Sequence, residues 1–464
     1  ELPNAVDWER SVTVDNNPQL EVLSMPLLAV SGSSAPVISA TQNDALTTVD
    51  FSSVDRVNGM SINGLSITEL RLDGMETSNG VSLGPLPALT SLDLSGLLEL
   101  DGNPSSFRDL GALSALPMPA LQSASLLQFV GAMPPAIDLP SLTFVDRLTL
   151  GQTTGLSAFS APALDSTRLE VRVFQNQELE TLTLTGLRAT TLDIEDNPAL
   201  REVDVSSLST FTFDLTFEGN GTAPGLAPFD LTFPSLVETE WILSIQGNDA
   251  LRAVRFPALT NLTGSRSRIL LTDNPTLDAL SVPLLEEIEG TSGLTIVRAG
   301  ALTSFEAPSL VRSRVVFDDN DALMSVSFPL LVEAPTLTIQ NHAALTSLSF
   351  PSLTTVGALT IFRNAALTSV SVFSGVTSGM TTLNVQQNDL LESLSGLENL
   401  GDAAGADPIF GSLSFNNPLI CRDDAQAFFD ALEAKYPGDM VSPGFATVTG
   451  PTCPAPTSPE EDGR

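Results

Sequence analysis

Short phrases of alternating apolar and polar residues recur along the chain, and each ends at an amide. In ALTIFRNAALTSVSV (358–372), Leu359 and Ile361 alternate with polar residues, as in a strand with one buried face. Asn364 then follows where another apolar residue would be expected. The phrase LDIEDNPALREVDV (192–205) repeats the arrangement. Because the phrases recur with a mean period of roughly 25 residues, we predict a repeat protein.

Each repeat carries three apolar edges: the strand itself, a second apolar pair, and a corner that often contains proline, as in FPSL (350–353). A single coil of this kind cannot bury three edges, so successive coils must stack and share one interior. The strands of stacked coils then form parallel ladders with a spacing of about 4.8 Å. We therefore predict a mainly β, β-helix-like solenoid of roughly 17 coils.

The recurring amide is predicted to be structural. Where the chain turns inward after the strand, backbone groups lose both water and ladder partners, and an Asn side chain can satisfy them in its own coil and the next. His342 takes the same place without an accompanying nucleophile pattern, so we assign it the structural role rather than a catalytic one. The predicted row consists of Asn17, Asn43, Asn103, Asn176, Asn197, Asn220, Asn248, Asn274, Asn320, His342, Asn364 and Asn388.

The two ends of the array differ from its middle. Residues 1–10, which include Trp8, are predicted to form an N-terminal cap, and residues 11–420 the solenoid. Residues 421–453 are predicted to form a C-terminal cap, with an amphipathic helix that starts at Asp423 or Asp424 and stops at Pro437. Residues 454–464 have the composition of a disordered, acidic, proline-rich tail.

The two cysteines are Cys421 and Cys453, which favours one disulfide bond that closes the C-terminal cap in an exported protein. A metal site would need more ligands than one His and two Cys supply. The sequence starts at Glu1, which suggests that a signal peptide or tag has been removed. These features together predict an extracellular or cell-surface location.

The charge balance narrows the choice of partners. The chain has 55 acidic and 20 basic residues among 464, a formal net charge of -35. This charge argues against nucleic acid or an anionic membrane as the main partner, and it leaves cations and basic partners open. No stretch approaches the roughly 20 apolar residues that a membrane-spanning helix needs.

Four residues on the outward face beside the amide row are candidates for partner binding. Phe174 and Phe362 are aromatic residues in a polar surround, which often dominate the energy of an interface, although each ring could instead fold against its own sheet. Arg363 follows Phe362, and Arg298 is expected to pair with Asp273 and Asp319 in the coils on either side.

Five acidic residues are candidates for a cation site. When the repeats are aligned on their strands, no basic residue occupies the neighbouring outward positions. Either water and salt screen the charges of these acidic residues, or a hard cation such as Ca²⁺ binds between them. The two groups are Glu195, Asp196 and Glu218, and Asp73 and Asp101. No other cofactor is expected.

The Leu-x-Ile strands with their Asn turn, FPSL (350–353), FPAL (256–259) and NNPLIC (416–421) resemble the receptor L-domain branch of the leucine-rich-repeat proteins. That branch includes the ligand-binding lobes of the insulin and EGF receptors, fungal GPI-anchored cell-wall proteins and exported bacterial proteins. The resemblance covers roughly residues 11–453 and implies a right-handed solenoid that binds proteins or serves in a cell wall without catalysis. The chain lacks the receptors' cysteine-rich module, so it is more similar to the bacterial surface and fungal cell-wall members.

These observations favour an exported, non-enzymatic binding or adhesion protein that uses one solenoid face to bind a protein or glycan at the cell surface. A structural surface or cell-wall protein that assembles with itself is the main alternative. Two further alternatives are a polysaccharide-acting β-helix enzyme, which would use paired carboxylates, and an ice-binding protein, which would use flat rows of threonine. The sequence is poor in the aromatic residues that sugar sites favour, with two Trp and one Tyr.

Overall fold

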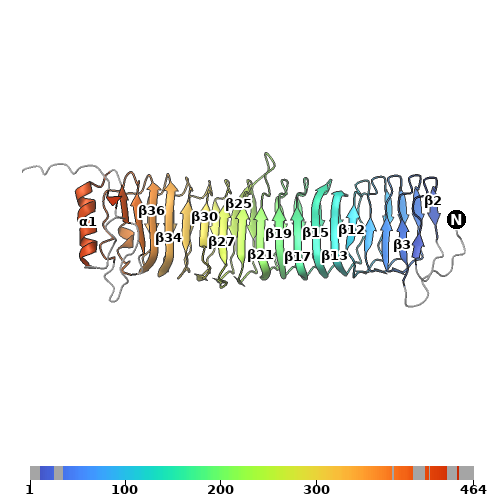
Figure 1. The fold of residues 1–464 in the computed structure, drawn as a ribbon, viewed down its shortest axis with the longest axis horizontal. Coiled ribbons are helices and arrows are strands. Elements are labelled where there is room, and N and C mark those ends of the chain that lie inside the picture. The colour runs from blue at the N-terminus through green and yellow to red at the C-terminus, as the bar shows by residue number, and fades with distance from the viewer. Residues whose placement is uncertain are drawn as a thin grey trace, which may run out of the picture. The chain divides into compact units, whose positions relative to one another are not determined.

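The computed structural model of the chain describes residues 11–25, 35–378, 381–400, 413–416, 419–435 and 447–448. Contacts divide the chain into two compact units, unit 1 (Glu1–Ala258) and unit 2 (Leu259–Arg464). Each unit is a stack of coils whose strands pair in parallel with the strands of neighbouring coils (Figure 1). The prediction of a mainly β, parallel solenoid is confirmed. The domain boundaries and the handedness of the coil stay predictions.

The longest ladder of unit 1, which we call its main sheet, contains the strands that precede the amides. Within unit 1, neighbouring strands of this ladder pair in parallel from one coil to the next. The strands are β1 (Ser11–Thr13), β3 (Val37–Ala40), β6 (Gly59–Ile62), β9 (Val81–Leu83), β12 (Ser105–Arg108), β13 (Ser123–Ala132), β15 (Phe144–Thr154), β17 (Ser166–Phe174), β19 (Ala189–Glu195), β21 (Thr210–Glu218) and β24 (Ile242–Gln246).

Two further edges complete each coil of unit 1, and their strands are short. The second edge is formed by β2 (Val22–Ser24), β4 (Thr48–Asp50), β7 (Glu69–Arg71) and β10 (Ser91–Asp93), then by β14 (Ala136–Asp138), β16 (Ala158–Ser160), β18 (Thr181–Thr183) and β20 (Glu202–Asp204), then by β22 (Phe229–Thr232) and β25 (Leu251–Arg255). The third edge includes β5 (Arg56–Val57), β8 (Thr77–Ser78), β11 (Glu99–Leu100) and β23 (Glu238–Thr239).

Unit 2 repeats this arrangement with its own main sheet. That sheet contains β27 (Arg268–Thr272), β30 (Gly293–Val297), β32 (Val315–Asp318), β34 (Glu333–His342), β36 (Thr355–Asn364), β37 (Thr382–Gln386) and β38 (Leu413–Asn416), with β39 (Thr447–Val448) beside β38. The other edges are formed by β28 (Ala279–Ser281), β31 (Ser304–Glu306), β33 (Ser325–Ser327) and β35 (Ser347–Ser349), and by β26 (Asn261–Leu262) and β29 (Glu287–Ile288). A 3₁₀ turn, η1 (Ser371–Phe373), follows β36.

Each unit has a continuous apolar interior in which equivalent side chains stack from coil to coil. In unit 1, the rings of Phe233 and Phe256 stack with centroids 5.2 Å apart. In unit 2, Phe350 lies between Phe328 at 5.5 Å and Phe373 at 5.6 Å. All five rings are almost completely buried. The Phe of each FPSL or FPAL phrase points inward and fills the corner that follows the second edge. The proline after it ends the strand.

A row of buried amides joins successive coils of each main sheet. The Nδ2 of Asn197 donates to the carbonyl oxygen of Val173 at 3.1 Å, and its Oδ1 accepts the backbone N–H of Asn176 at 3.1 Å. Asn220 makes the same two contacts one coil later, with Ile194 and Asn197. Each amide therefore satisfies backbone groups of the preceding coil, at a turn that buries them. The buried members are Asn43, Asn176, Asn197, Asn220, Asn248, Asn274, Asn320, His342, Asn364 and Asn388.

His342 occupies this row and contacts the backbone of the preceding coil. Its Nδ1 lies 3.2 Å from the backbone nitrogen of Asn320, the contact that an Asn Oδ1 makes elsewhere. Burial lowers the pKa of the imidazole, so the ring is neutral at physiological pH. The Nδ1 nitrogen also lies 3.2 Å from the carbonyl oxygen of Asn320, and the tautomer of the ring decides which of the two contacts is a hydrogen bond. A side chain held in this way is buried away from the surface and part of the stack.

Asn103 was predicted to belong to the row, and that prediction is wrong. Asn103 is exposed in the turn between β11 and β12. In this coil the inward residue of the strand is Phe107, and the position three residues later, which Asn takes elsewhere, holds buried Leu110. Asn17, in the first described coil, is also exposed, and its Nδ2 donates to the carbonyl of Asp15 in its own coil at 3.0 Å.

One helix, α1 (Arg422–Lys435), follows the last strands of unit 2. It begins one residue before Asp423, so the predicted N-cap residues lie in its first turn, where their charges favour the positive end of the helix dipole. Phe428 lines a cavity of about 200 Å³ together with Leu394 and Ile420. Cys453, residues 1–10 and residues 454–464 lie outside the described residues, so the Cys421–Cys453 disulfide, the N-terminal cap and the disordered tail stay predictions.

Candidate functional site

Phe174 lies at the end of β17 on the outer face of the main sheet of unit 1. Its ring covers Gly151 in the preceding coil so closely that a Cβ on Gly151 would lie 2.3 Å from the ring. The guanidinium of Arg172 lies over the ring, 4.6 Å from its centroid. Phe174 is therefore half-buried between its own sheet and an arginine. This is the folded arrangement rather than the free anchor that the sequence left open.

Phe362 in unit 2 has a similar cover. The guanidinium of Arg363 lies 4.7 Å from the centroid of the Phe362 ring, and its Nε donates to Gln387 Oε1 at 2.6 Å in the next coil. Such a cation–π contact contributes on the order of 0.5–1 kcal/mol at an exposed site. A partner would have to displace Arg363 from both contacts to reach the ring.

Arg298 is also engaged within unit 2. Its guanidinium binds the carboxylate of Asp273 in the preceding coil with two hydrogen bonds, one of them 2.8 Å long. These hydrogen bonds lower the pKa of Asp273. Asp319, in the following coil, forms no ion pair with Arg298 in the described part of the chain. The expected pairing across three coils is thus present on one side only.

Arg172 also neutralises part of the acidic group of unit 1. Its Nη2 lies 3.5 Å from Glu195, and its Nε lies 3.1 Å from Asp193, both in the next coil. The prediction that Glu195 has no basic neighbour is wrong, because Arg172 reaches it diagonally from the strand position two residues before Phe174. Glu218 lies directly beside Glu195 in the ladder and is exposed, as is Asp196.

Asp193 has the most perturbed carboxyl of this face. Burial, followed by the nearby carboxylate of Glu195, raises its pKa from 3.8 to about 6. The ion pair with Arg172 opposes this shift without cancelling it. The pair is also poorly directed, because Arg172 Nε makes no hydrogen bond and Asp193 Oδ1 has no partner. The arrangement makes Asp193 sensitive to mildly acidic pH.

The grouping of Asp73 with Asp101 as a cation site is wrong. Asp73 follows β7, which belongs to the second edge of its coil, whereas Asp101 follows β11 on the third edge. The two phrases resemble main-sheet phrases in sequence, but their strands pair with different ladders. Among the described residues, no group of three His, Cys, Asp or Glu side chains is placed to hold a metal ion.

An aromatic pair that sequence reasoning missed lies elsewhere on unit 1. The rings of Phe213 and Trp241 are in contact, with centroids 5.2 Å apart and planes tilted by 47°. Phe213 is 58% exposed, more than any other described Phe, Tyr or Trp. No pattern in the sequence marks this exposure, because Phe213 stands within TFTFDLTFE (210–218), where the other two Phe are buried.

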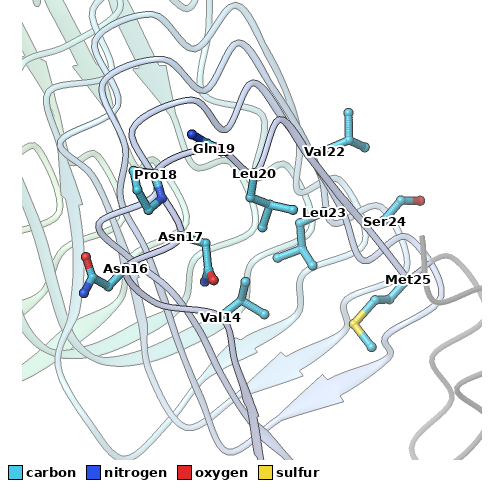
Figure 2. A pocket seen from close by; sticks show the side chains of 10 residues that line it. All are labelled: Val14, Asn16, Asn17, Pro18, Gln19, Leu20, Val22, Leu23, Ser24 and Met25. Atoms are coloured by element: carbon cyan, nitrogen blue, oxygen red, sulfur yellow. The ribbon is translucent and has the colours of Figure 1, made fainter.

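A pocket of about 630 Å³ opens at the first described coil (Figure 2). Its walls include the inward residues of that coil, among them Val14, Leu20, Leu23 and Met25. In the described part of the chain β1 pairs only with β3, so its other edge has no strand beside it. The pocket is therefore the open interior of a coil rather than a cleft with converging polar groups.

No known protein family matches the sequence, and no curated protein matches it. Solved structures that resemble it include a TLR13–ssRNA13 complex, at 12% identity over 92% of this chain and 83% of that one, with a TM-score of 0.22. A leucine-rich repeat protein from Bacteroides ovatus ATCC 8483 has 12% identity over 73% of this chain and 87% of its own, with a TM-score of 0.22. A leucine rich cell surface protein from Faecalibacterium prausnitzii A2-165 has 11% identity over 65% and 78%, with a TM-score of 0.19. Likeness at this level carries no argument about ligand or activity.

Proposed function

We propose that the chain is an exported, non-enzymatic binding or adhesion protein that uses a solenoid face to bind a macromolecular partner at a cell surface. The observation that carries this proposal is the contact between exposed Phe213 and partly exposed Trp241 at the margin of a parallel sheet. Large aromatic rings on a rigid support lose little conformational entropy when a partner covers them, and such rings dominate many interfaces. The resemblance of the repeat phrases to the L-domain branch agrees with a binding role.

The chemistry of the sheet face supports binding more than catalysis. The carboxylates of Asp193 and Glu195 lie beside Arg172, and that of Asp273 is held by Arg298. A glycosidase needs two carboxylates that face a bound sugar. Ion pairs that tie those groups to arginine oppose such a role.

Among the described residues no helix has the length and apolar character needed to cross a bilayer.

A structural protein that assembles with itself is the second candidate. The open interior of the first described coil and the edge of β1, which has no partner strand in the described part of the chain, favour it, because an unpaired edge strand is a template for another chain. Light scattering at increasing protein concentration distinguishes the two functions. Growth of large particles at micromolar concentration would support self-assembly, whereas constant scattering would favour a monomeric binder.

The binding function is tested by capture on the immobilised full chain. Cell-envelope extract is passed over the chain and over an equally acidic, unrelated protein, and retained material is identified by mass spectrometry for protein and by compositional analysis for glycan. We expect one partner to be retained by the chain alone, with an affinity that purified partner reproduces. Retention of the same material on both columns, or of none, would overturn the proposal. Labelling of intact cells with a membrane-impermeant reagent tests the surface location.

A further inference from the structure

The exposed aromatic pair results from β-bulges at the corner where the third edge of unit 1 joins its main sheet. In β19 one residue separates Thr190 from Leu192, whereas in β21 three residues separate their partners Phe211 and Leu215. Phe213 is the middle of these three. Because the two extra residues have no counterpart in the preceding coil, the chain must bulge outward, and the middle side chain points to solvent.

The next coil bulges in the same way and presents Trp241. Trp241 lies between buried Thr239 at the end of β23 and Leu243, which pairs with Leu215. Two hydrogen bonds fix the bulge: the N–H of Trp241 donates to Thr239 Oγ1 at 3.1 Å, and that of Ile242 donates to Asp214 Oδ1 at 3.0 Å in the preceding coil. The backbone that presents Trp241 is therefore fixed by contacts within the chain, independently of a ligand.

The charges around this corner are negative. Glu238 and Glu240 are exposed and form no ion pair in the described part of the chain, and Asp214 adjoins Phe213. Arg188, in the coil before that of Phe213, is paired with Asp165 at 3.0 Å. We call Phe213, Trp241, Glu238 and Glu240 the aromatic corner. It combines a ring pair that is at least partly exposed with two exposed carboxylates that form no ion pair among the described residues.

We propose that the aromatic corner binds an arginine- or lysine-bearing segment of a partner protein. This inference rests on the proposed binding function and names the class of partner. A guanidinium stacks on the face of Trp241 or Phe213, where the ring quadrupole attracts it, while its N–H groups donate to Glu238 or Glu240. The net charge of -35 steers such a segment toward the chain and repels nucleic acid and acidic polysaccharide.

The emission of Trp241 provides a direct test. Trp8 is replaced by Phe in the full chain, so that Trp241 is the remaining tryptophan. The chain is titrated with a peptide of five Arg-Gly repeats and, separately, with five Glu-Gly repeats. We expect a saturable change in Trp241 emission with the arginine peptide and none with the glutamate peptide. The apparent affinity is expected to fall with added salt.

Three variants separate a specific site from general attraction between a polycation and an acidic protein. Phe213→Ser leaves the charge unchanged and is expected to weaken binding roughly tenfold. Glu238→Gln with Glu240→Gln is expected to weaken binding and reduce the salt dependence. Phe144→Ser is the matched control, because Phe144 is another exposed Phe of unit 1, in β15, and its loss is expected to change affinity less than twofold.

Equal loss in Phe213→Ser and Phe144→Ser, or no loss in either, would overturn the inference. A saturable response to neutral cellohexaose without one to the arginine peptide would also overturn it and assign the corner to a glycan. The proposed function fails separately, through the absence of any specific partner on the capture column. A captured partner that binds wild type and Phe213→Ser equally would retain the function and remove the aromatic corner as its site.

Discussion

Two aromatic sites of unit 1 differ in what covers them. Phe174 belongs to a regular stretch of the main sheet, where its ring contacts both Gly151 of the preceding coil and the guanidinium of Arg172. Phe213 belongs to a bulge, where the preceding coil has no equivalent residue, and it remains 58% exposed beside Trp241. In a solenoid, regular register hides large side chains against the next coil, and a local loss of register exposes them.

The contact between Phe174 and Gly151 gives the largest expected effect. Gly151→Ala places a methyl group 2.3 Å from the present ring position, so the ring must move, and we expect a loss of about 1–3 kcal/mol in the free energy of unfolding. The same substitution in a Phe174→Ala background is expected to cost less than about 0.5 kcal/mol. Urea denaturation of the four proteins measures the difference. Additive effects would show that Phe174 does not pack on Gly151.

The stability of unit 1 near Phe174 is also expected to depend on pH, through Asp193. Its carboxyl has a pKa raised from 3.8 to about 6. As the pH rises, Asp193 therefore loses its proton at a lower pH in the unfolded chain than in the folded chain. The contribution of Asp193 to stability is therefore lost as pH rises from about 4 to about 6, and it stays lost above that range. Relative to Asp193→Asn, wild type is expected to lose about 1–2 kcal/mol between pH 4 and pH 7.

Denaturation at three pH values tests this sign, with Asp273→Asn of unit 2 as the control. Arg298 lowers the pKa of Asp273, so its stabilising contribution is present at neutral pH and is lost as pH falls through the lowered pKa. The two variants should thus depart from wild type in opposite directions. A stability difference for Asp193→Asn that does not change with pH would refute the assignment.

Removing the rings themselves is expected to separate stability from binding. Phe174→Ser should lower the free energy of unfolding by about 1 kcal/mol, since it removes the sheet contact and the arginine contact, and it should leave partner affinity unchanged. Phe213→Ser should change stability by less than about 0.5 kcal/mol because most of the ring is already exposed. Thermal unfolding and partner titration of both variants provide the comparison. Loss of partner affinity in Phe174→Ser but not in Phe213→Ser would show instead that Phe174 contacts the partner.

Calcium is expected to have the smallest effect. The sequence left open whether a cation or solvent compensates Glu195, Asp196 and Glu218, and Arg172 supplies part of that compensation. We therefore expect millimolar calcium or chelator to shift the unfolding temperature by less than about 1 °C. A clear rise with calcium that Glu218→Gln abolishes would instead establish a cation site on the covered face.

The coil and most of its amide row could be predicted from the sequence because both follow from repetition. In each such repeat an Asn follows a Leu-x-Ile strand at a fixed distance, so its side chain is expected to point inward. His342 stands at the same distance from its strand and is buried in the same row. The predictions that Asp73 and Asp101 share a cation site and that Asn103 belongs to the amide row are wrong. The strands of the second and third edges show the same apolar alternation as the main sheet, so the sequence does not distinguish them. Only the strand partners decide which ladder such a phrase joins.

The candidate site was harder to predict because it depends on relations between coils. The cover on Phe174 comes from Gly151, 23 positions earlier, and the exposure of Phe213 comes from two residues that the neighbouring strand lacks. Neither relation is visible within one repeat. Bulges also shift the side chain to the opposite face, since one residue of slip reverses the alternation.

Hydroxyl-radical footprinting read by mass spectrometry tests the central claim most directly, because aromatic side chains oxidise according to their exposure. In the free chain we expect Phe213 and Trp241 to be oxidised several times faster than Phe174. On addition of the captured partner, protection should concentrate on Phe213 and Trp241 and leave Phe174 unchanged. Oxidation of Phe174 at the rate of Phe213, or protection confined to Phe174, would contradict the account.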